Sequence, residues 1–453
     1  MTDWSKNTIH TLDITGYSAE GMGIGRTEGR VVFVPGTIRG EQWRVRLEKV
    51  GKTAAWGRGV ELLAPSPQRQ APDCPLYGRC GACQFRHMTY AEELAAKGQR
   101  VTDALERLGG VCLALPPVLG AENPLRYRNK VQLPVSQEKN GLAVGYYRAR
   151  SHSVLDARDC LLQPEAVTRL RQAFQTWMER YAVPAYQERE GSGLIRHFYV
   201  RTNQRGESLC CIVANGTELP CVQALIDALR QTEPGLTGLV LNCNTRDTNV
   251  ILGPEFHTLW GRDWLEEELC GLTFRLSISS FFQINRAQTE RLYRTALEFA
   301  GLTGAETVLD LYCGIGTISL AMARRAKAVL GAEIVPQAIE DARENARRNG
   351  IANAEFFCGD AGAVGRKLAG EGVRPDVVCV DPPRKGLSPE VPGILAGMAP
   401  ERIVYVSCDP ATLARDVKRF GELGYRARRG QAVDLFPRTA HIETVMLLQR
   451  AAV

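Results

Sequence analysis

The feature that most constrains the fold is a regular alternation of strand-like and helix-like segments from about residue 280 onward. Five apolar segments have the length and composition of buried strands, at residues 307–311, 328–333, 354–357, 377–381 and 403–408. Such alternation predicts an α/β fold with a doubly wound parallel sheet, whose ligand crevice lies at the carboxyl ends of the strands. Reactive side chains are therefore expected where these strands end.

The first of these strands ends in a glycine-containing loop, residues 310–317, of sequence Asp-Leu-Tyr-Cys-Gly-Ile-Gly-Thr. Glycines at this place let the backbone approach a nucleotide-type cofactor closely. Glu333 ends the next strand, near the spacing at which an acid binds ribose hydroxyls. The dinucleotide fingerprint lacks its third glycine, so S-adenosylmethionine, which has no pyrophosphate, fits better than NAD. Asp360, after the third strand, is either an adenine contact or a helix N-cap.

A thiol stands at the end of the last of the five strands, where Cys408 precedes an Asp-Pro pair. Asp381 opens an Asp-Pro-Pro motif on the strand before it, and Arg384 follows where amino methyltransferases of purines have an aromatic residue. An exocyclic amine needs no thiol, but C5 of a pyrimidine becomes nucleophilic only after a thiolate adds to C6. Cys408 is thus a candidate nucleophile. The alternative is a small buried residue, the ordinary role of a cysteine.

The same chemistry needs a base that removes the proton from C5. Glu443 precedes the strand-like residues 445–448 and is the first candidate. His441 competes with it, because two residues along a strand share a face. A carboxylate at a strand end is also a common surface feature. The thiolate is the reacting form, so the chemistry requires Cys408 to lose its proton.

A second group of cysteines lies far from this region. Cys74, Cys80 and Cys83 share a loop rich in glycine and proline, and Cys160 is the nearest plausible fourth ligand. Converging thiolates suit tetrahedral zinc or a four-cysteine iron–sulfur cluster. Zinc sites more often pair two Cys-x2-Cys hooks, so the spacing leans toward a [4Fe–4S] cluster and leaves zinc open.

Length and composition limit these interpretations. The chain of 453 residues is long enough for two or three domains. No apolar run approaches the ~18–20 residues that span a bilayer, and residues 1–10 have no signal core. We therefore expect a cytoplasmic protein whose 14 cysteines stay reduced. The net charge of +6 permits a polyanionic partner without requiring one.

The N-terminal half differs in its pattern. Residues 7–65 alternate in short segments around a glycine-rich turn at residues 21–25, which predicts a small barrel of the oligonucleotide-binding type or a β-domain used only for packing. Residues 90–108 predict a helix with Leu94, Val101, Leu105 and Leu108 on one face. Residues 125–270 mix strand-like and helix-like stretches, an α+β pattern.

Together these features resemble the RNA uracil-5-methyltransferase family, in particular the branch that acts on 23S rRNA and carries an N-terminal TRAM domain. The resemblance covers nearly the whole chain. It is carried by the glycine-rich β-domain, the cysteine loop and residues 281–285, 310–317, 381–384, 407–416 and 441–445. It implies a TRAM barrel at residues 1–65, a central iron–sulfur and RNA-binding domain at residues 66–89 and 125–272, and a Rossmann-like methyltransferase domain at residues 90–124 and 273–453.

The resemblance also implies roles for single residues. Cys408 would be the nucleophile and Glu443 the base. The ligands of a [4Fe–4S] cluster would be Cys74, Cys80, Cys83 and Cys160. Contacts to S-adenosylmethionine would come from Gln283, Tyr312, Gly314, Thr317, Glu333, Asp360 and Asp381. Two positions depart from the family pattern, since Thr317 and Asp409 each stand where asparagine is usual.

The expected function is therefore methylation of C5 of a uridine in 23S rRNA by a cytoplasmic monomer, after the target base leaves its stack. The alternatives are the same chemistry on tRNA, a cytosine-5 enzyme, or a non-catalytic iron–sulfur RNA-binding protein in which Cys408 is inert. The basic and aromatic runs at residues 126–130 and 146–150 are either RNA contacts or exposed faces of strands.

Overall fold

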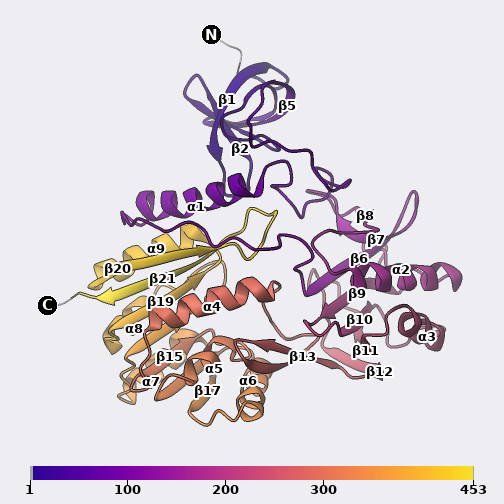
Figure 1. The fold of residues 1–453 in the computed structure, drawn as a ribbon. Coiled ribbons are helices and arrows are strands. Elements are labelled where there is room, and N and C mark those ends of the chain that lie inside the picture. The colour runs from indigo at the N-terminus through magenta and orange to yellow at the C-terminus, as the bar shows by residue number, and fades with distance from the viewer. Residues whose placement is uncertain (1–3, 452–453) are drawn as a thin grey trace.

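The computed structural model describes residues 4–451 and has three parts: a barrel, a central sheet, and a C-terminal sheet with helices on both faces (Figure 1). The barrel is closed, with the strand order β1-β2-β3-β5-β4. Its strands are β1 (Ile9–Tyr17), β2 (Gly23–Thr27), β3 (Arg30–Val34), β4 (Gln42–Val50) and β5 (Ala54–Ala64). Inward-facing aliphatic side chains fill it. The small barrel expected for this region is confirmed.

One segment of the barrel differs from the prediction. Residues 21–25 were expected to form a turn, but strand β2 begins within them. A Cβ atom at Gly23 would overlap the hydroxyl of Thr37, and one at Gly25 would lie 3.1 Å from the Cβ of Leu12. These two glycines therefore allow a close approach inside the barrel, which is a packing requirement rather than a turn requirement.

Helix α1 (Tyr90–Arg107) lies beneath the barrel in Figure 1 and packs against helix α9 (Pro410–Glu422) of the C-terminal part. The predicted helix is confirmed, but its buried face is only partly the predicted one. Val101 and Leu105 are buried, whereas Leu108 is 53% exposed and caps the C-terminus.

Charged side chains complete the buried face of α1. The Lys97 ammonium donates to Glu93 at 2.8 Å and to Asp434 at 2.7 Å. The hydroxyl of Tyr90 donates to the second Asp434 oxygen at 2.8 Å. Buried charges are tolerated when they are paired and hydrogen-bonded, so this network ties α1 to a segment near the C-terminus.

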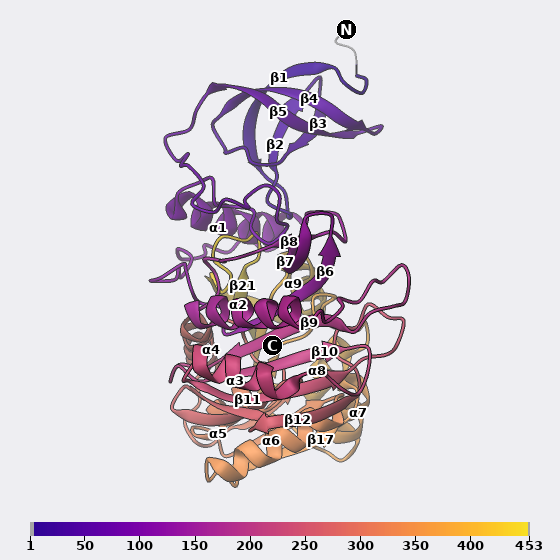
Figure 2. The same ribbon diagram turned by 90° about the vertical axis from the view of Figure 1, so that its right-hand side faces the viewer.

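The central part is a seven-stranded sheet in the order β12-β11-β10-β9-β6-β7-β8. Its strands are β6 (Lys130–Glu138), β7 (Gly141–Tyr147), β8 (Val154–Asp156), β9 (Ile195–Thr202), β10 (Ser208–Ala214), β11 (Leu236–Cys243) and β12 (Glu255–Gly261). Helices α2 (Glu165–Arg180) and α3 (Val222–Thr232) lie side by side over the sheet (Figure 2) and contribute Phe174 and Leu225 to its core. The expected α+β pattern is confirmed.

A hairpin of β13 (Trp264–Leu269) and β14 (Leu272–Ser277) leads to the C-terminal sheet, whose order is β17-β16-β15-β18-β19-β21-β20. Its strands are β15 (Thr307–Leu311), β16 (Ala328–Glu333), β17 (Ala354–Cys358), β18 (Val377–Val380), β19 (Arg402–Ser407), β20 (Tyr425–Val433) and β21 (Glu443–Arg450). Its other helices are α4 (Arg286–Ala300), α5 (Thr317–Ala323), α6 (Pro336–Arg348), α7 (Ala361–Gly370) and α8 (Val391–Met398). β15 to β19 are mutually parallel, and only β21 runs antiparallel to its two neighbours. The doubly wound sheet is confirmed.

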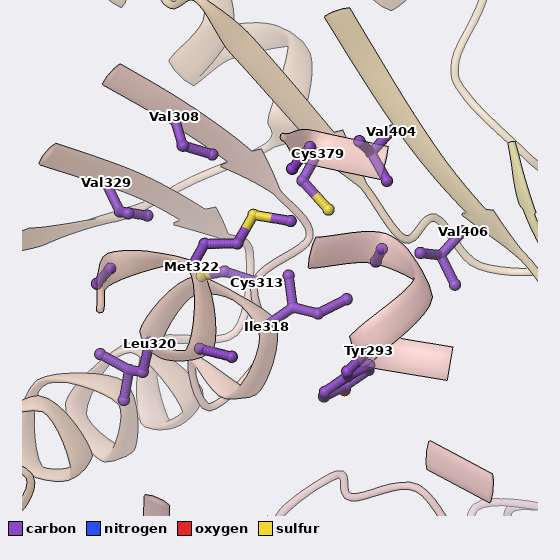
Figure 3. Close-up of a cluster of buried hydrophobic side chains, with 14 of the residues drawn as sticks. Tyr293, Val308, Cys313, Ile318, Leu320, Met322, Val329, Cys379, Val404 and Val406 are labelled. Atoms are coloured by element: carbon purple, nitrogen blue, oxygen red, sulfur yellow. The ribbon is translucent and has the colours of Figure 1, made fainter. Parts of the chain in front are cut away.

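The core of this part lies directly behind the loop that follows β15. Cys313 and Cys379 are buried among the aliphatic side chains of Val308, Val329 and Val404 (Figure 3). They act as small apolar residues, as expected for Cys379. None of the helices within residues 4–451 is both long and apolar enough to cross a membrane.

Candidate active site

The strand register aligns the chemically important residues along one edge of the C-terminal sheet. Val380 on β18 pairs with Leu311 on β15 and with Tyr405 on β19. The strand order reverses between β15 and β18, which is where open α/β sheets bind ligands. The residues that follow these strands therefore meet at the crevice outside the carboxyl ends.

The loop after β15 adopts the backbone conformation that the glycine pattern predicts. Tyr312 has a φ of 75°, Gly314 of 55° and Gly316 of 83°, and Gly316 is the N-cap of α5. Glu333, at the end of β16, accepts hydrogen bonds from the amides of Gly314 at 3.3 Å and Val335 at 3.0 Å. The acid predicted to bind ribose thus lies against the loop predicted to bind the cofactor.

Asp360 lies in the same region, and its helix-cap interpretation is confirmed. One carboxylate oxygen accepts from the amides of Gly362 at 2.9 Å and Ala363 at 3.2 Å, at the start of α7. Burial, with a contribution from the Asp360 charge, raises the pKa of Tyr312 to about 12. The two side chains are therefore close enough to interact, and the capping role of Asp360 does not separate it from Tyr312.

Two further predicted cofactor residues lie at the start of α5 and just before α4. The hydroxyl of Thr317, the first residue of α5, is partly buried and lies 2.8 Å from that of Tyr293. The carbonyl of Gln283 accepts from the side-chain amide of Asn129 at 3.0 Å, which joins the segment before α4 to the central part.

Cys408 follows β19 and faces the beginning of β21. Ser407 pairs with Thr444, so Cys408 and Glu443 are neighbours across the two strands. Asp409 is the N-cap of α9 and accepts from the amides of Ala411 at 3.0 Å and Thr412 at 2.9 Å. An aspartate caps a helix as well as an asparagine does, so this departure from the family pattern has a structural explanation.

The electrostatics of this site are unusual for a nucleophile. Burial raises the pKa of the Cys408 thiol to about 11, and the charges of Glu443 and Asp381 add to the rise. The Arg384 guanidinium opposes it. Without substrate the thiol is therefore protonated at neutral pH, and the site does not hold a preformed thiolate.

The pKa values of the acids beside the thiol are also raised. Burial raises the pKa of Asp381 to about 7. Burial and the charge of Asp381 raise the pKa of Glu443 well above its usual range. His441 differs, because burial and the nearby Arg384 lower its pKa to about 4. Its ring lies 3.4 Å from Arg384. A neutral histidine held at Arg384 is a weaker candidate base than the carboxyl that faces Cys408.

Two residues of this region were not predicted. Asp310, at the end of β15, is buried and its pKa is raised to about 7 by that burial, against a hydrogen bond from Ser319. Arg100 of α1 donates to the carbonyl of Ala440 at 2.7 Å and pairs with Asp409 at 3.7 Å. Arg100 thereby bridges the chain segments that carry Cys408 and Glu443. Its sequence neighbours offer no signal, because both of its partners lie more than 300 positions away.

Two cysteines of the loop, Cys80 and Cys83, lie close enough to Cys160 to interact with it electrostatically. Cys80 interacts electrostatically with Cys160 and Cys74, and Cys83 with Cys160 and Cys80. Burial raises the pKa of Cys83 to about 11, against the charge of Arg86, and the neighbouring thiols add to the rise. An all-sulfur donor set fits a soft metal centre, which would stabilise the thiolates that burial disfavours.

A different group of potential ligands lies at the edge of the central sheet. The ligand atoms of Cys243, Glu255 and His257 lie within 4.8 Å of one another. Glu255 and His257 are exposed, on strand β12. This group shares no residue with the cysteine loop.

The two basic and aromatic runs have different environments. Arg126 is bound to Asp159 at 2.7 Å and to the Cys160 carbonyl at 3.0 Å, so it supports the cysteine loop instead of presenting its charge to solvent. The second run is open. Arg148 and Arg150 are exposed and line a hollow of about 490 Å³ beside Gly81 and Ala82 of the cysteine loop.

Known proteins share both the motifs and the architecture. Residues 257–451 match the tRNA (Uracil-5-)-methyltransferase family, and residues 4–59 match the TRAM domain. An uncharacterized RNA methyltransferase of Clostridium tetani is 44% identical over 98% of this chain and 96% of its own length. One from Halalkalibacterium halodurans is 40% identical over 98% of both chains. The Pyrococcus abyssi tRNA (uracil-54, C5)-methyltransferase in complex with S-adenosyl-L-homocysteine has a TM-score of 0.77 at 27% identity, over 97% of this chain and 99% of that one.

Proposed function

This chain belongs to the RNA uracil-5-methyltransferase family, and from that premise we propose that Cys408 and Glu443 methylate C5 of a uridine in 23S rRNA. The enzyme is an RNA methyltransferase that depends on S-adenosylmethionine. The observation that supports the residue assignment is the pairing of Ser407 with Thr444, which places a thiol and a buried carboxyl side by side. Asp381 lies with them at the end of the neighbouring strand.

In the proposed mechanism the Cys408 thiol loses its proton to solvent and its sulfur bonds to C6 of the uracil. The electrons of the C5–C6 double bond move onto C5 and O4. When bound, S-adenosylmethionine would supply an electrophilic methyl group, and C5 would take that methyl as its bond to the sulfonium sulfur breaks and the cofactor leaves as a neutral thioether. Glu443 then removes the proton from C5, the C5–C6 double bond re-forms, and the bond between sulfur and C6 breaks. The raised pKa of Glu443 suits this step, because a carboxylate with a raised pKa is a stronger base than an ordinary one.

The same proposal assigns the cofactor side of the crevice. The loop at Tyr312 and Gly314 would hold S-adenosylmethionine with Glu333, Asp360 and Asp381, flanked by Gln283 and Thr317. The target base must leave its stack to reach a half-buried thiol, which costs a few kcal/mol in a paired region. An unpaired uridine in a loop is therefore the expected substrate.

The choice of 23S rRNA is supported by the resemblance of the cysteine loop and barrel to the ribosomal branch. The same chemistry on tRNA is the second candidate, because the Pyrococcus abyssi protein acts on tRNA and has the same architecture. Transcripts of both RNAs, incubated with enzyme and labelled cofactor, would separate the two. We expect methyl transfer to 23S rRNA. Transfer to tRNA alone would establish the second candidate.

RNA containing 5-fluorouridine tests the catalytic residues directly. Fluorine at C5 cannot leave as the proton does, so the RNA stays bonded to Cys408 and the peptide can be identified by mass spectrometry. Cys408→Ala should abolish the adduct and lower methyl transfer by about 10⁴-fold or more while RNA binding persists. Cys358→Ala, at the exposed last residue of β17, is the matched control. An adduct on another residue would overturn the mechanism.

We further propose that Cys74, Cys80, Cys83 and Cys160 bind a [4Fe–4S] cluster. Protein purified without oxygen should contain about four irons and four sulfides per chain if the family ligand set applies. Cys83→Ser should lower both together. Zinc in place of iron would instead support the alternative metal site.

A further inference from the structure

The segment that leads to the proposed base lies against the residues that follow the cysteine loop. The amides of Gln84 and Phe85 both donate to the carbonyl of Arg438, at 3.0 Å and 3.1 Å. The side-chain oxygen of Gln84 accepts from the amide of Ala440 at 3.1 Å. Gln84 follows Cys83 directly, and Ala440 stands three positions before Glu443.

The cysteine loop in turn fixes Gln84 at both ends. The hydroxyl of Tyr77, between the first two cysteines, donates to the Gln84 carbonyl at 2.8 Å. The side-chain NH2 of Gln84 donates to the Gly81 carbonyl at 3.0 Å. One side chain thus joins a carbonyl inside the cysteine loop to an amide of the segment before the base.

Packing makes this connection stiff. Ala440, Phe85, Met88 and Ile38 form a small buried cluster, so a barrel residue also supports the segment. The amide of Ala440 is occupied by Gln84 and its carbonyl by Arg100, at 2.7 Å. With both of its backbone groups bound and its side chain buried, this peptide unit has little freedom to move.

We propose that Gln84 is a positioning residue through which the cysteine loop fixes the place of Glu443. The inference rests on the proposed function, in which Glu443 removes the C5 proton after Cys408 has added to C6. Loss of the Gln84 contact should therefore slow proton removal and leave addition of the thiol nearly intact. This assigns the cysteine loop a part in the reaction, although it is distant from Glu443 in sequence.

Three glutamine variants test the proposal. Gln84→Ala removes both side-chain contacts, whereas Gln84→Glu keeps an oxygen for the Ala440 amide and loses the donor to Gly81. Gln70→Ala is the matched control, because Gln70 holds the same region through the Arg86 carbonyl, at 3.3 Å, and its hydrogen bonds within the described residues do not reach residues 438–443. The visible absorbance of each variant reports whether the cysteine loop still holds its proposed cluster.

Turnover of Gln84→Ala should fall about 10- to 100-fold, the usual effect of a base displaced by an ångström. Its adduct yield with 5-fluorouridine RNA should match wild type, and deuterium at C5 should slow it more than wild type, because proton removal has become limiting. Hydrogen exchange at the Ala440 amide should rise. Gln84→Glu should recover most of the turnover, and Gln70→Ala should behave as wild type.

Equal losses of adduct and turnover in Gln84→Ala, without a larger isotope effect, would show a merely structural role and overturn the proposal. So would unchanged exchange at Ala440. If the wild-type protein forms no adduct at all, the proposed function fails, but the exchange comparison still tests the link between Gln84 and residues 438–443.

Discussion

At Cys408 the thiol shares one half-buried space with the carboxyls of Asp381 and Glu443 and the guanidinium of Arg384. Acids that lie close together in a low dielectric cannot all be ionised at once. Their titrations are therefore coupled, and each pKa depends on the protonation of the other groups. The free enzyme stores the nucleophile as a thiol. In the proposed mechanism its ionisation therefore accompanies substrate binding, and a thiol that stays protonated between turnovers is less open to oxidation.

Alkylation of Cys408 by iodoacetamide should follow this electrostatic balance. Only the thiolate reacts, so the rate in wild type should rise with pH toward a midpoint near 11. Glu443→Gln removes a negative charge that disfavours the thiolate, so the pKa of Cys408 falls and the rate at pH 8 rises by about 10-fold. Arg384→Ala removes the opposing cation and should lower the rate.

Mass spectrometry of the Cys408 peptide measures these rates, with the exposed Cys112 as an internal reference. Shifts of the same sign in both variants would contradict the electrostatic explanation. A wild-type midpoint near pH 8 would show that burial does not raise the pKa of Cys408.

Sequence patterns placed the reacting residues correctly at strand ends but not their protonation. Cys408 and Asp381 follow strands and Glu333 ends one, and strand ends can be predicted from apolar runs. The pKa of Cys408 depends on Glu443 and Arg384, which reach it only through the sheet register. Asp360 shows the opposite case, since its helix cap could be predicted locally and was found.

At the scale of single elements, helix α9 fixes the direction of the chain after Cys408. Asp409 caps it, and Pro410 occupies its first turn, where a missing amide costs nothing. The Asp-Pro pair that marked the strand end in the sequence is therefore the start of a helix. The helix cap, Asp409, and the proposed nucleophile, Cys408, are adjacent residues. The hydrogen bonds that fix Asp409 therefore also help to fix the position of Cys408.

Asp409→Ala should lower the free energy of unfolding by about 1 kcal/mol, the typical cost of a lost N-cap. Asp409→Asn keeps a capping oxygen and should lie close to wild type in thermal unfolding. If both variants lose the same stability, the pair with Arg100 matters more than the cap, because asparagine preserves the cap and removes only the charge.

Helix α1 marks the limit of local patterns at this scale. Its existence and length were predicted from apolar spacing, within one residue of the observed Tyr90–Arg107. Its buried face was predicted only in part. Lys97 is buried because it pairs with Asp434, and the sequence around Lys97 gives no sign of that remote partner. Apolar periodicity cannot identify a buried charge whose partner is remote in sequence.

At the scale of the whole molecule, the hollow at Arg148 and Arg150 is an open basic surface beside the cysteine loop. Phosphate contacts add affinity without sequence information, and each one steepens the dependence of binding on salt. If RNA crosses this surface, loss of the two arginines should raise KM and have little effect on the rate of the chemical step.

Arg148→Glu combined with Arg150→Glu should weaken RNA binding. It should also reduce the slope of log Kd against log salt concentration by the amount that corresponds to about two lost phosphate contacts. Filter binding at several salt concentrations measures both quantities. Arg426→Glu combined with Arg428→Glu, at two exposed positions of β20, changes the charge equally and is the control. An equal effect in the control would mean that net charge, not the hollow, is responsible.

The assembly of the three parts could not be predicted from composition or periodicity. Each part has its own pattern and was recognised by it, but the contacts between parts include hydrogen bonds between polar and charged side chains that are remote in sequence. Tyr17 of the barrel, for example, donates to Glu92 of α1 at 2.8 Å. Such pairs have no periodic signature, and only the folded chain shows which of many charged residues meet.

The bond between Lys97 and Asp434 spans 337 positions of the chain. A ribosome adds about 5–20 residues per second, so α1 emerges roughly 20–70 seconds before its partner. During that time its amphipathic face is open to chaperones. Glu443, the proposed base, stands on β21 only nine positions after Asp434, so the remote partner of α1 and the proposed base are synthesised almost together.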